Sequence, residues 1–173
     1  MNPEITQKEF LQAYETYSDA IFRYCYFQTS NREQSLDLAQ DVFTKAWEYL
    51  AAGKTVTHMK AFLYRIASNA VIDWRRKKKS MSLDKLMEAG FDYSSGEDEV
   101  ETKEVFFEAK QAVKMIGQLD EKYKEVLLLR YVDELSIKEI AETVGETENN
   151  VSVRIHRGLE QVKKIFSAKG GSA

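Results

Sequence analysis

The most constraining stretch of the sequence is residues 60–79, KAFLYRIASNAVIDWRRKKK, because its apolar and charged residues separate onto different sides of a helix. At about 100° per residue, one side collects Leu63, Ile66, Ala67, Ala70 and Trp74. Nearly the opposite side collects Arg65, Asn69, Ile72 and Arg76. We therefore expect a helix that buries its apolar side, Trp74 included, in a core.

The same stretch ends in an unbroken basic run, RRKKK at residues 75–79. Runs of this kind bind phosphate backbones in nucleic-acid-binding proteins. The alternative is a solvated face whose cations only stabilise the C-terminal end of the helix through its dipole. The length of the run favours a polyanion as partner.

Composition restricts the class of protein. The 173 residues suffice for one domain or two small ones. Cys25 is the only cysteine, which excludes an intramolecular disulfide and favours a reducing compartment. The N-terminus lacks a signal-peptide pattern, and no stretch approaches about 18 consecutive apolar residues. We expect a cytoplasmic protein without membrane insertion.

The net charge of −3 argues against a generic polyanion binder. The charges are unevenly distributed, however: acids crowd residues 92–104, whereas residues 75–79 and 154–164 are basic. Our hypothesis is that an acidic linker masks two basic surfaces.

Helical periodicity recurs along the chain and Pro3 is the only proline, so the predicted fold class is all-α. Three pairs have the spacing of a capping box: Thr6 with Glu9, Ser30 with Glu33, and Ser136 with Glu139. The first helix should end near residue 28, and the second should end at Gly53.

The helical spacing also predicts which side chains face inward. In the first helix these are Phe10, Tyr14, Tyr17, Ile21 and Tyr24 or Cys25. In the second they are Leu36, Ala39, Val42 or Phe43, Ala46 and Tyr49 or Leu50. In the last they are Val151, Ile155, Leu159, Val162 and Phe166.

The periodicity weakens from Ser80 onward. Residues 80–99 are rich in Ser, Gly and acids, the composition of a flexible connector. We therefore predict two small helical domains, residues 1–79 and 100–173, joined by a flexible acidic linker at residues 80–99.

Near the C-terminus, two short helical patterns flank Gly145, the arrangement of a helix-turn-helix. Such a unit places the start of its second helix in the major groove. The candidate DNA-binding residues there are Thr147, Asn149, Asn150, Ser152, Val153, Arg154 and Arg157. Arg154 suits guanine, Asn150 suits adenine, and Arg157 suits the phosphate backbone. The alternative is an αα-hairpin that only packs against a neighbour.

Enzyme chemistry has little support in the sequence. His58 and His156 lie far apart, no metal-ligand spacing joins them to Cys25, and no glycine-rich phosphate loop is present. Asp37 and Asp41 lie one helical turn apart, but an exposed acidic face requires no unusual pKa. We expect no catalytic residue, no metal ligand and no cofactor.

Three separated motifs carry a family resemblance: DLAQDVFTKAW at 37–47, FLYRIASNAVIDWRRKKK at 62–79 and LSIKEIAETVGETENNVSVRIHRGL at 135–159. In order and spacing the chain resembles the extracytoplasmic-function sigma factors of bacterial RNA polymerase. The family commonly has glycine at Asn149, an apolar residue at Glu146 and lysine at Ser152. These departures concern the promoter sequence, not the class.

The resemblance implies a protein without enzymatic activity that gives core RNA polymerase its promoter choice. Its first domain, region 2, would dock on the coiled coil of the polymerase β′ clamp through Asp37, Gln40, Asp41 and Phe43. Its second domain, region 4, would contact the β flap and read the minus-thirty-five element as duplex through the helix-turn-helix. A separate anti-sigma factor would regulate it.

The resemblance also assigns the minus-ten element to the first domain. The loop at residues 53–58 would hold a flipped base, and basic and amide side chains would face the melted strand. These residues are Lys54, Lys60, Arg65, Asn69, Arg75, Arg76, Lys77 and Lys78. The competing hypothesis is a stand-alone helix-turn-helix repressor or activator, which has no reason to carry such a first domain and usually needs a dimer.

Overall fold

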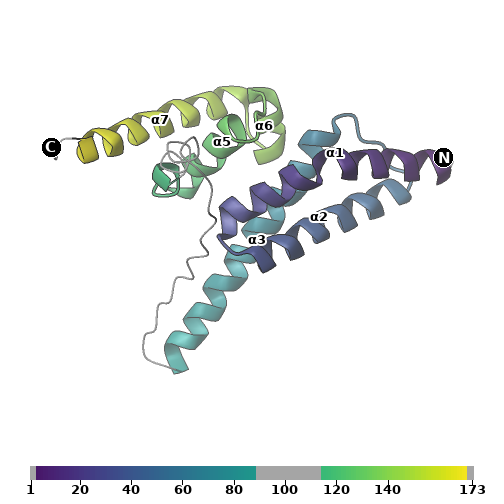
Figure 1. Cartoon of the computed structure of the whole chain (residues 1–173), viewed down its shortest axis with the longest axis horizontal. Helices are drawn as coiled ribbons and strands as arrows, with labels where there is room; N and C mark the ends of the chain where they lie inside the picture. Colours follow the sequence, from purple (N-terminus) through teal and green to yellow (C-terminus); the bar gives the residue numbers. More distant parts are fainter. Residues whose placement is uncertain (1–2, 89–113, 171–173) are drawn as a thin grey trace, which may run out of the picture. The chain divides into compact units, whose positions relative to one another are not determined.

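The computed structural model describes residues 3–88 and 114–170, including the side chains of residues 6–80 and 114–168. All regular elements in these ranges are helices, which confirms the predicted all-α class for the described part of the chain. The chain divides into two compact units, Met1–Asp98 and Glu99–Ala173 (Figure 1).

The first unit contains α1 (Pro3–Thr29), α2 (Arg32–Ala51) and α3 (Met59–Glu88). Helices α1 and α2 lie side by side and α3 packs against both (Figure 1). Its largest fully buried side chains are Ile21, Tyr24, Val42, Leu50, Leu63, Tyr64 and Val71. The rings of Tyr24 and Tyr64 meet edge to face with centroids 5.6 Å apart, a favourable aromatic geometry. This core fixes α3 and thereby its exposed side.

Two predicted capping boxes in this unit are wrong. Helix α1 begins at Pro3, where proline's fixed φ suits the first turn, so Thr6 and Glu9 lie inside the helix. The N-cap of α2 is Asn31, not Ser30, because the Asn31 side chain accepts a 2.9 Å hydrogen bond from the Gln34 amide. Asn and Ser are equally good N-caps, so the sequence pattern could not separate the neighbouring residues.

Three side chains predicted to face inward are exposed: Tyr14, Leu36 and Phe166, with exposed fractions of 48%, 49% and 64%. Periodicity identifies the apolar side of a helix, but a neighbouring element must cover that side to bury it. The other members of the predicted inward sets are buried or half-buried, and Cys25 is fully buried.

Helix α2 is followed by a C-cap at Ala52 and by Gly53, whose φ of 77° is the left-handed conformation that glycine adopts without strain. After the short loop at residues 54–58, α3 continues beyond Lys79 to Glu88, so the first part of the predicted linker is helical. The acidic cluster at residues 92–104 lies outside the described residues, as does the predicted start of the second domain at residue 100.

The second unit contains α5 (Glu121–Tyr131), α6 (Ile137–Val144) and α7 (Glu148–Gly170), packed around Val126, Leu127, Leu129, Leu135, Ile140 and Val151. The capping box at Ser136 and Glu139 is present in both directions, and Gly145 ends α6 with a φ of 70°. Thr147 Oγ1 accepts a hydrogen bond from the Asn150 amide at 3.2 Å. The predicted helix-turn-helix is therefore confirmed at its caps and its turn. None of the described helices has the length and apolarity needed to span a bilayer.

Candidate nucleic-acid interface

One side of α3 exposes a row of polar side chains over the core of the first unit. Arg65, Asn69 and Arg76 are all exposed, and Ile72 stands between them with 45% of its surface accessible. The buried residues Leu63, Ala67 and Ala70 occupy the other side. These exposed side chains can therefore bind a ligand without any change in the core. Arg76 also contacts Asp73 at 3.4 Å, an exposed pair that water screens.

The cations of the basic run at residues 75–79 differ in their surroundings. Arg75 is half-buried, and its Nη2 donates a hydrogen bond to Gln28 Oε1 at the end of α1. Lys78 Nζ lies 5.0 Å from the centroid of the Trp74 ring. Arg76, Lys77 and Lys78 are exposed. The structure thus turns Arg75 toward α1 and leaves the other three cations of the predicted set in this run accessible.

Trp74 connects α3 to α2. Its ring is half-buried, and its Nε1 donates a 3.0 Å hydrogen bond to Gln34 Oε1. The predicted packing role of Trp74 agrees with this position. At the other end of α3, Lys60 is half-buried, while Lys54 is exposed in the loop with its Nζ 4.9 Å from the Tyr49 ring centroid.

Helix α2 exposes Asp37, Gln40 and Asp41 on its outer side. Beside them an open groove of about 1000 Å³ runs between α1 and α2, and Gln40 forms part of its wall. The large apolar side chains of the groove are Phe10, Leu11, Tyr14, Phe22, Leu36, Phe43 and Trp47. Exposed apolar surfaces rimmed by polar groups are typical of binding sites.

Phe43 has a different place from the other predicted docking residues. It is only 5% exposed, and its ring packs edge-on against Tyr14 at 4.8 Å and Phe10 at 6.4 Å between centroids. Phe43 therefore forms the floor of the groove. Two aromatic side chains of the groove are exposed, Tyr14 on α1 and Trp47 on α2. Trp47 packs against Phe10 at 5.2 Å between ring centroids and was not among the predicted site residues. Trp47 lies four residues after Phe43, on the same side of α2, and this spacing could have identified it from the sequence.

In the second unit, α7 presents one side to α5 and leaves the other side open. Asn149, Asn150, Val153 and Arg157 are exposed, as is Thr147 before the helix. Ser152 is half-buried, with its hydroxyl bonded to the Glu148 carbonyl at 2.9 Å. Most of the predicted reading residues therefore share an accessible surface at the start of α7.

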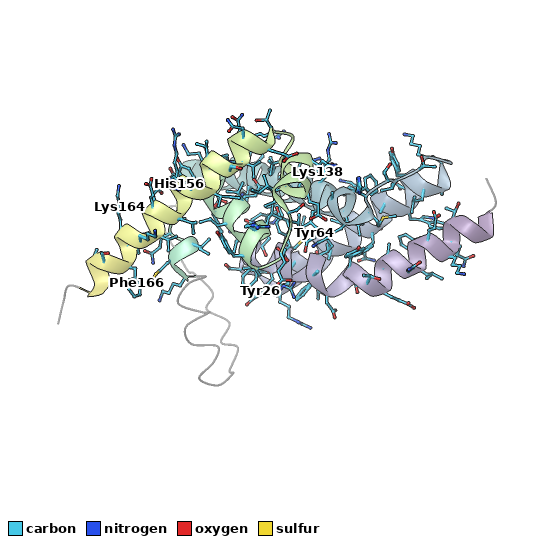
Figure 2. The ribbon with its side chains drawn as sticks, turned by 90° about the horizontal axis from the view of Figure 1, so that it is seen from above. Tyr26, Tyr64, Lys138, His156, Lys164 and Phe166 are labelled. Atoms are coloured by element: carbon cyan, nitrogen blue, oxygen red, sulfur yellow. The ribbon has the colours of Figure 1, made fainter. Side chains whose placement is uncertain are left out.

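Arg154 is the exception. Its Nη1 lies 2.7 Å from Glu146 Oε1, its Nε donates to the Lys122 carbonyl at 3.0 Å, and its side chain is only 16% exposed. In this structure the guanidinium faces its own unit, so its predicted contact with guanine stays untested. His156, by contrast, is exposed beside Val153 and Arg157, with Nε2 3.4 Å from Glu160 Oε1. Figure 2 shows His156 and Lys164 on the outer side of α7 and Phe166 on another side.

No cluster of His, Cys, Asp or Glu within the described ranges has the arrangement of a metal site. The surfaces are instead a polar row on α3, an apolar groove beside acidic α2, and the second helix of a helix-turn-helix. Together they define a two-unit helical protein that binds nucleic acid and a protein partner.

Comparison with known proteins gives the family. Residues 13–81 match Sigma-70 region 2, and residues 109–162 match Sigma-70, region 4. The chain is 32% identical over 172 residues to the ECF RNA polymerase sigma factor SigW of Bacillus subtilis, covering 91% of this chain and 89% of that protein. It is 28% identical to the RNA polymerase sigma factor YlaC of the same organism, covering 87% and 88%. The chain belongs to the ECF sigma factors, which direct RNA polymerase to promoters.

Solved structures share the fold. The sigma factor RpoE from Bartonella quintana, in complex with the anti-sigma factor NepR, has a TM-score of 0.76 at 19% identity, covering 92% of this chain and 98% of that one. CnrH, in complex with the cytosolic domain of CnrY, has a TM-score of 0.68 at 22% identity, covering 94% and 90%. At these identities the likeness concerns the fold.

Proposed function

We propose that α2 and its groove dock the chain on core RNA polymerase, that α3 holds the melted minus-ten strand, and that α7 reads the minus-thirty-five duplex. The observation that carries this proposal is the position of Arg65, Asn69 and Arg76. They form an exposed row on a helix whose other side is fixed in the core.

Capture of a single strand suits the chemistry of this row. Arginines attract phosphates, an asparagine amide can donate to and accept from a base edge, and Ile72 offers an apolar surface between them. Lys54 in the loop before α3 adds a cation where a flipped base would lie. Promoter opening would then be stabilised because bases unpaired by thermal motion are bound, without any chemical step.

Docking on the polymerase combines two features of α2. The exposed carboxylates of Asp37 and Asp41 can pair with basic residues of the β′ clamp coiled coil, and the apolar groove can take side chains of the same partner. Trp47 is an exposed aromatic side chain of α2 beside the groove, and tryptophan is a residue type that often dominates binding energy. Region 4 would contact the β flap at the same time.

In this proposed function the protein acts only by binding polymerase and DNA, and it has no catalytic role. Since it works on polymerase and promoter DNA, we expect it in the cytoplasm. A separate anti-sigma factor would hold it inactive by covering surfaces that polymerase needs. The complexes of RpoE with NepR and of CnrH with CnrY support such a partner, as does the exposed groove.

The test adds the purified chain to core polymerase and measures run-off transcription from linear promoters. We expect Asn69→Ala combined with Arg76→Ala to lose transcription on closed duplex, to keep core binding, and to recover on a template premelted at the minus-ten element. Lys8→Ala, which removes an exposed cation of α1, is the control. Failure of the premelted template to rescue the double variant would reject the role of α3.

Docking is tested separately by measuring the affinity for core polymerase without DNA. Trp47→Ala should weaken binding by about 2 kcal/mol or more if Trp47 is a central anchor. Ile72→Ala is the matched control, since it removes a comparably exposed apolar side chain from α3. Equal effects of the two substitutions would contradict docking through the groove. A stand-alone repressor would instead bind its operator tightly and show no dependence on polymerase.

A further inference from the structure

The guanidinium of Arg154 forms hydrogen bonds to other residues of the second unit. Nε donates to the Lys122 carbonyl at 3.0 Å, Nη2 donates to the same carbonyl, and Nη1 pairs with Glu146 Oε1 at 2.7 Å. Lys122 lies in the first turn of α5, and Glu146 lies in the turn between α6 and α7. One side chain therefore joins the start of α5, the turn and α7.

The side of α7 that carries Arg154 is the side that contacts α5. Val151 and Gly158, three residues before and four after Arg154, share its side of the helix and are buried. The helices are so close there that a Cβ on Gly158 would lie 3.0 Å from Leu127 Cδ1. Arg154 thus stands at the edge of a tight helix contact, where its bonds restrict the rotation and tilt of α7.

Arg157 lies one turn later and has a contrasting environment. Its side chain is exposed, on the side of α7 that also carries Asn149 and Val153. An arginine without such internal bonds can reach bases or phosphates at no cost to the packing of its unit. Arg154 would first have to leave both Glu146 and the Lys122 carbonyl.

We propose that Arg154 is a positioning residue, which holds α7 at the angle needed in the major groove, and that base preference comes from the exposed side with Asn149, Val153 and Arg157. This inference rests on the proposed reading of duplex DNA by α7. By the same argument Glu146 has a functional role, because it lies in the turn and its carboxylate holds the Arg154 guanidinium in place. Its carboxylate also favours the inward position of Arg154 over one turned outward to a base.

The experiment uses the full chain with core polymerase and a pool of duplex promoters randomised at the minus-thirty-five element. Arg154→Met, which keeps much of the stem and removes the guanidinium, should lower binding to all selected sequences by a common factor of about five to ten. The base preferences should stay those of the unsubstituted protein. Arg157→Ala should change the preference at particular positions instead.

The Glu146→Gln substitution distinguishes a positioning role of Arg154 from a role in reading a base. If Arg154 positions α7, losing the carboxylate weakens binding in the same sequence-independent way, and combining it with Arg154→Met adds less than the sum of the two. If Arg154 reads a base, Glu146→Gln releases it, and binding is kept or strengthened with the same consensus. A changed base preference in Arg154→Met alone, with undiminished binding by Glu146→Gln, would overturn the proposal.

Amide hydrogen exchange in the free full-length chain separates this inference from the proposed function. Both substitutions should speed exchange of the amides at residues 151–155 about fivefold, whether or not the chain reads a promoter. Unchanged exchange in the milder Glu146→Gln variant rejects the positioning role by itself. If instead exchange responds and no variant or parent binds the duplex pool, the proposed function fails while the structural part of the inference stands.

Discussion

Substitution of Ser136 by alanine should loosen the helix-turn-helix more than its exposed position suggests. Helix α6 has only eight residues, Ile137–Val144, and helices this short depend strongly on their ends. Ser136 Oγ accepts from the Glu139 amide at 3.2 Å, and Glu139 Oε2 accepts from the Ser136 amide at 2.8 Å. Removing the hydroxyl leaves an amide at the helix start without its side-chain acceptor.

The expected loss is about 1 kcal/mol, within the range of roughly 0.5 to 2 kcal/mol for replacing an N-cap by alanine. That free energy corresponds to about a fivefold increase in the population of locally opened α6. Glu139→Gln should have a smaller effect, because an amide oxygen can still accept from Ser136 while only the favourable charge at the helix start is lost.

The measurement is native-state hydrogen exchange at residues 140–144 in the full-length chain. Glu142→Ala is the matched control, because Glu142 is exposed on the same helix and lies outside the capping box. Exchange should quicken in Ser136→Ala and stay nearly constant in Glu142→Ala. Equal rates in the two variants would refute the argument that the cap stabilises this helix.

Three further predictions concern the core, the turn and the basic run. Leu63→Ala, at a fully buried position, should lower the free energy of unfolding of the first unit by about 2 to 5 kcal/mol in urea titrations, whereas exposed Ile72→Ala should change it by less than about 0.5 kcal/mol. Gly145→Ala should cost about 1 to 2 kcal/mol in thermal unfolding of the second unit, because its φ of 70° strains a residue with a Cβ; an unchanged transition would contradict this. In single-strand binding by the polymerase complex, Lys77→Gln with Lys78→Gln should lower the slope of log affinity against log salt by about 0.7 for each lysine that neutralises a phosphate in the parent complex, and an unchanged slope would exclude both lysines from the backbone.

Local features were the most predictable from the sequence. The Ser136 and Glu139 capping box and the turn at Gly145 depend on residues within one or two turns, and the structure confirms both. The same pattern failed at Ser30 because Asn31 is an equally good cap one residue later. Sequence patterns of this local kind thus located these helix ends to within a few residues. That precision was sufficient to place α7, the second helix of the helix-turn-helix.

Features that depend on distant neighbours were less predictable. Leu36 has the right period for a core residue, yet no described element covers it, so it borders the groove instead. Arg154 has the expected place in a recognition helix, but its acceptor is the carbonyl of Lys122, 32 residues earlier. Periodicity gives the direction of a side chain and carries no information on what the fold brings to meet it.

The hydrogen bond between Trp74 and Gln34 has a consequence for the order of events at a promoter. Gln34 belongs to the helix proposed to dock on polymerase, and Trp74 belongs to the helix proposed to hold the strand. If docking shifts α2, this bond would carry the shift to α3, and the two proposed binding events would be coupled. Because such coupling is reciprocal, DNA bound on α3 would then change the affinity of α2 for polymerase by the same factor by which docking changes the affinity of α3 for the strand. Loss of the strand from α3 would then remove that contribution to the binding of α2 to polymerase.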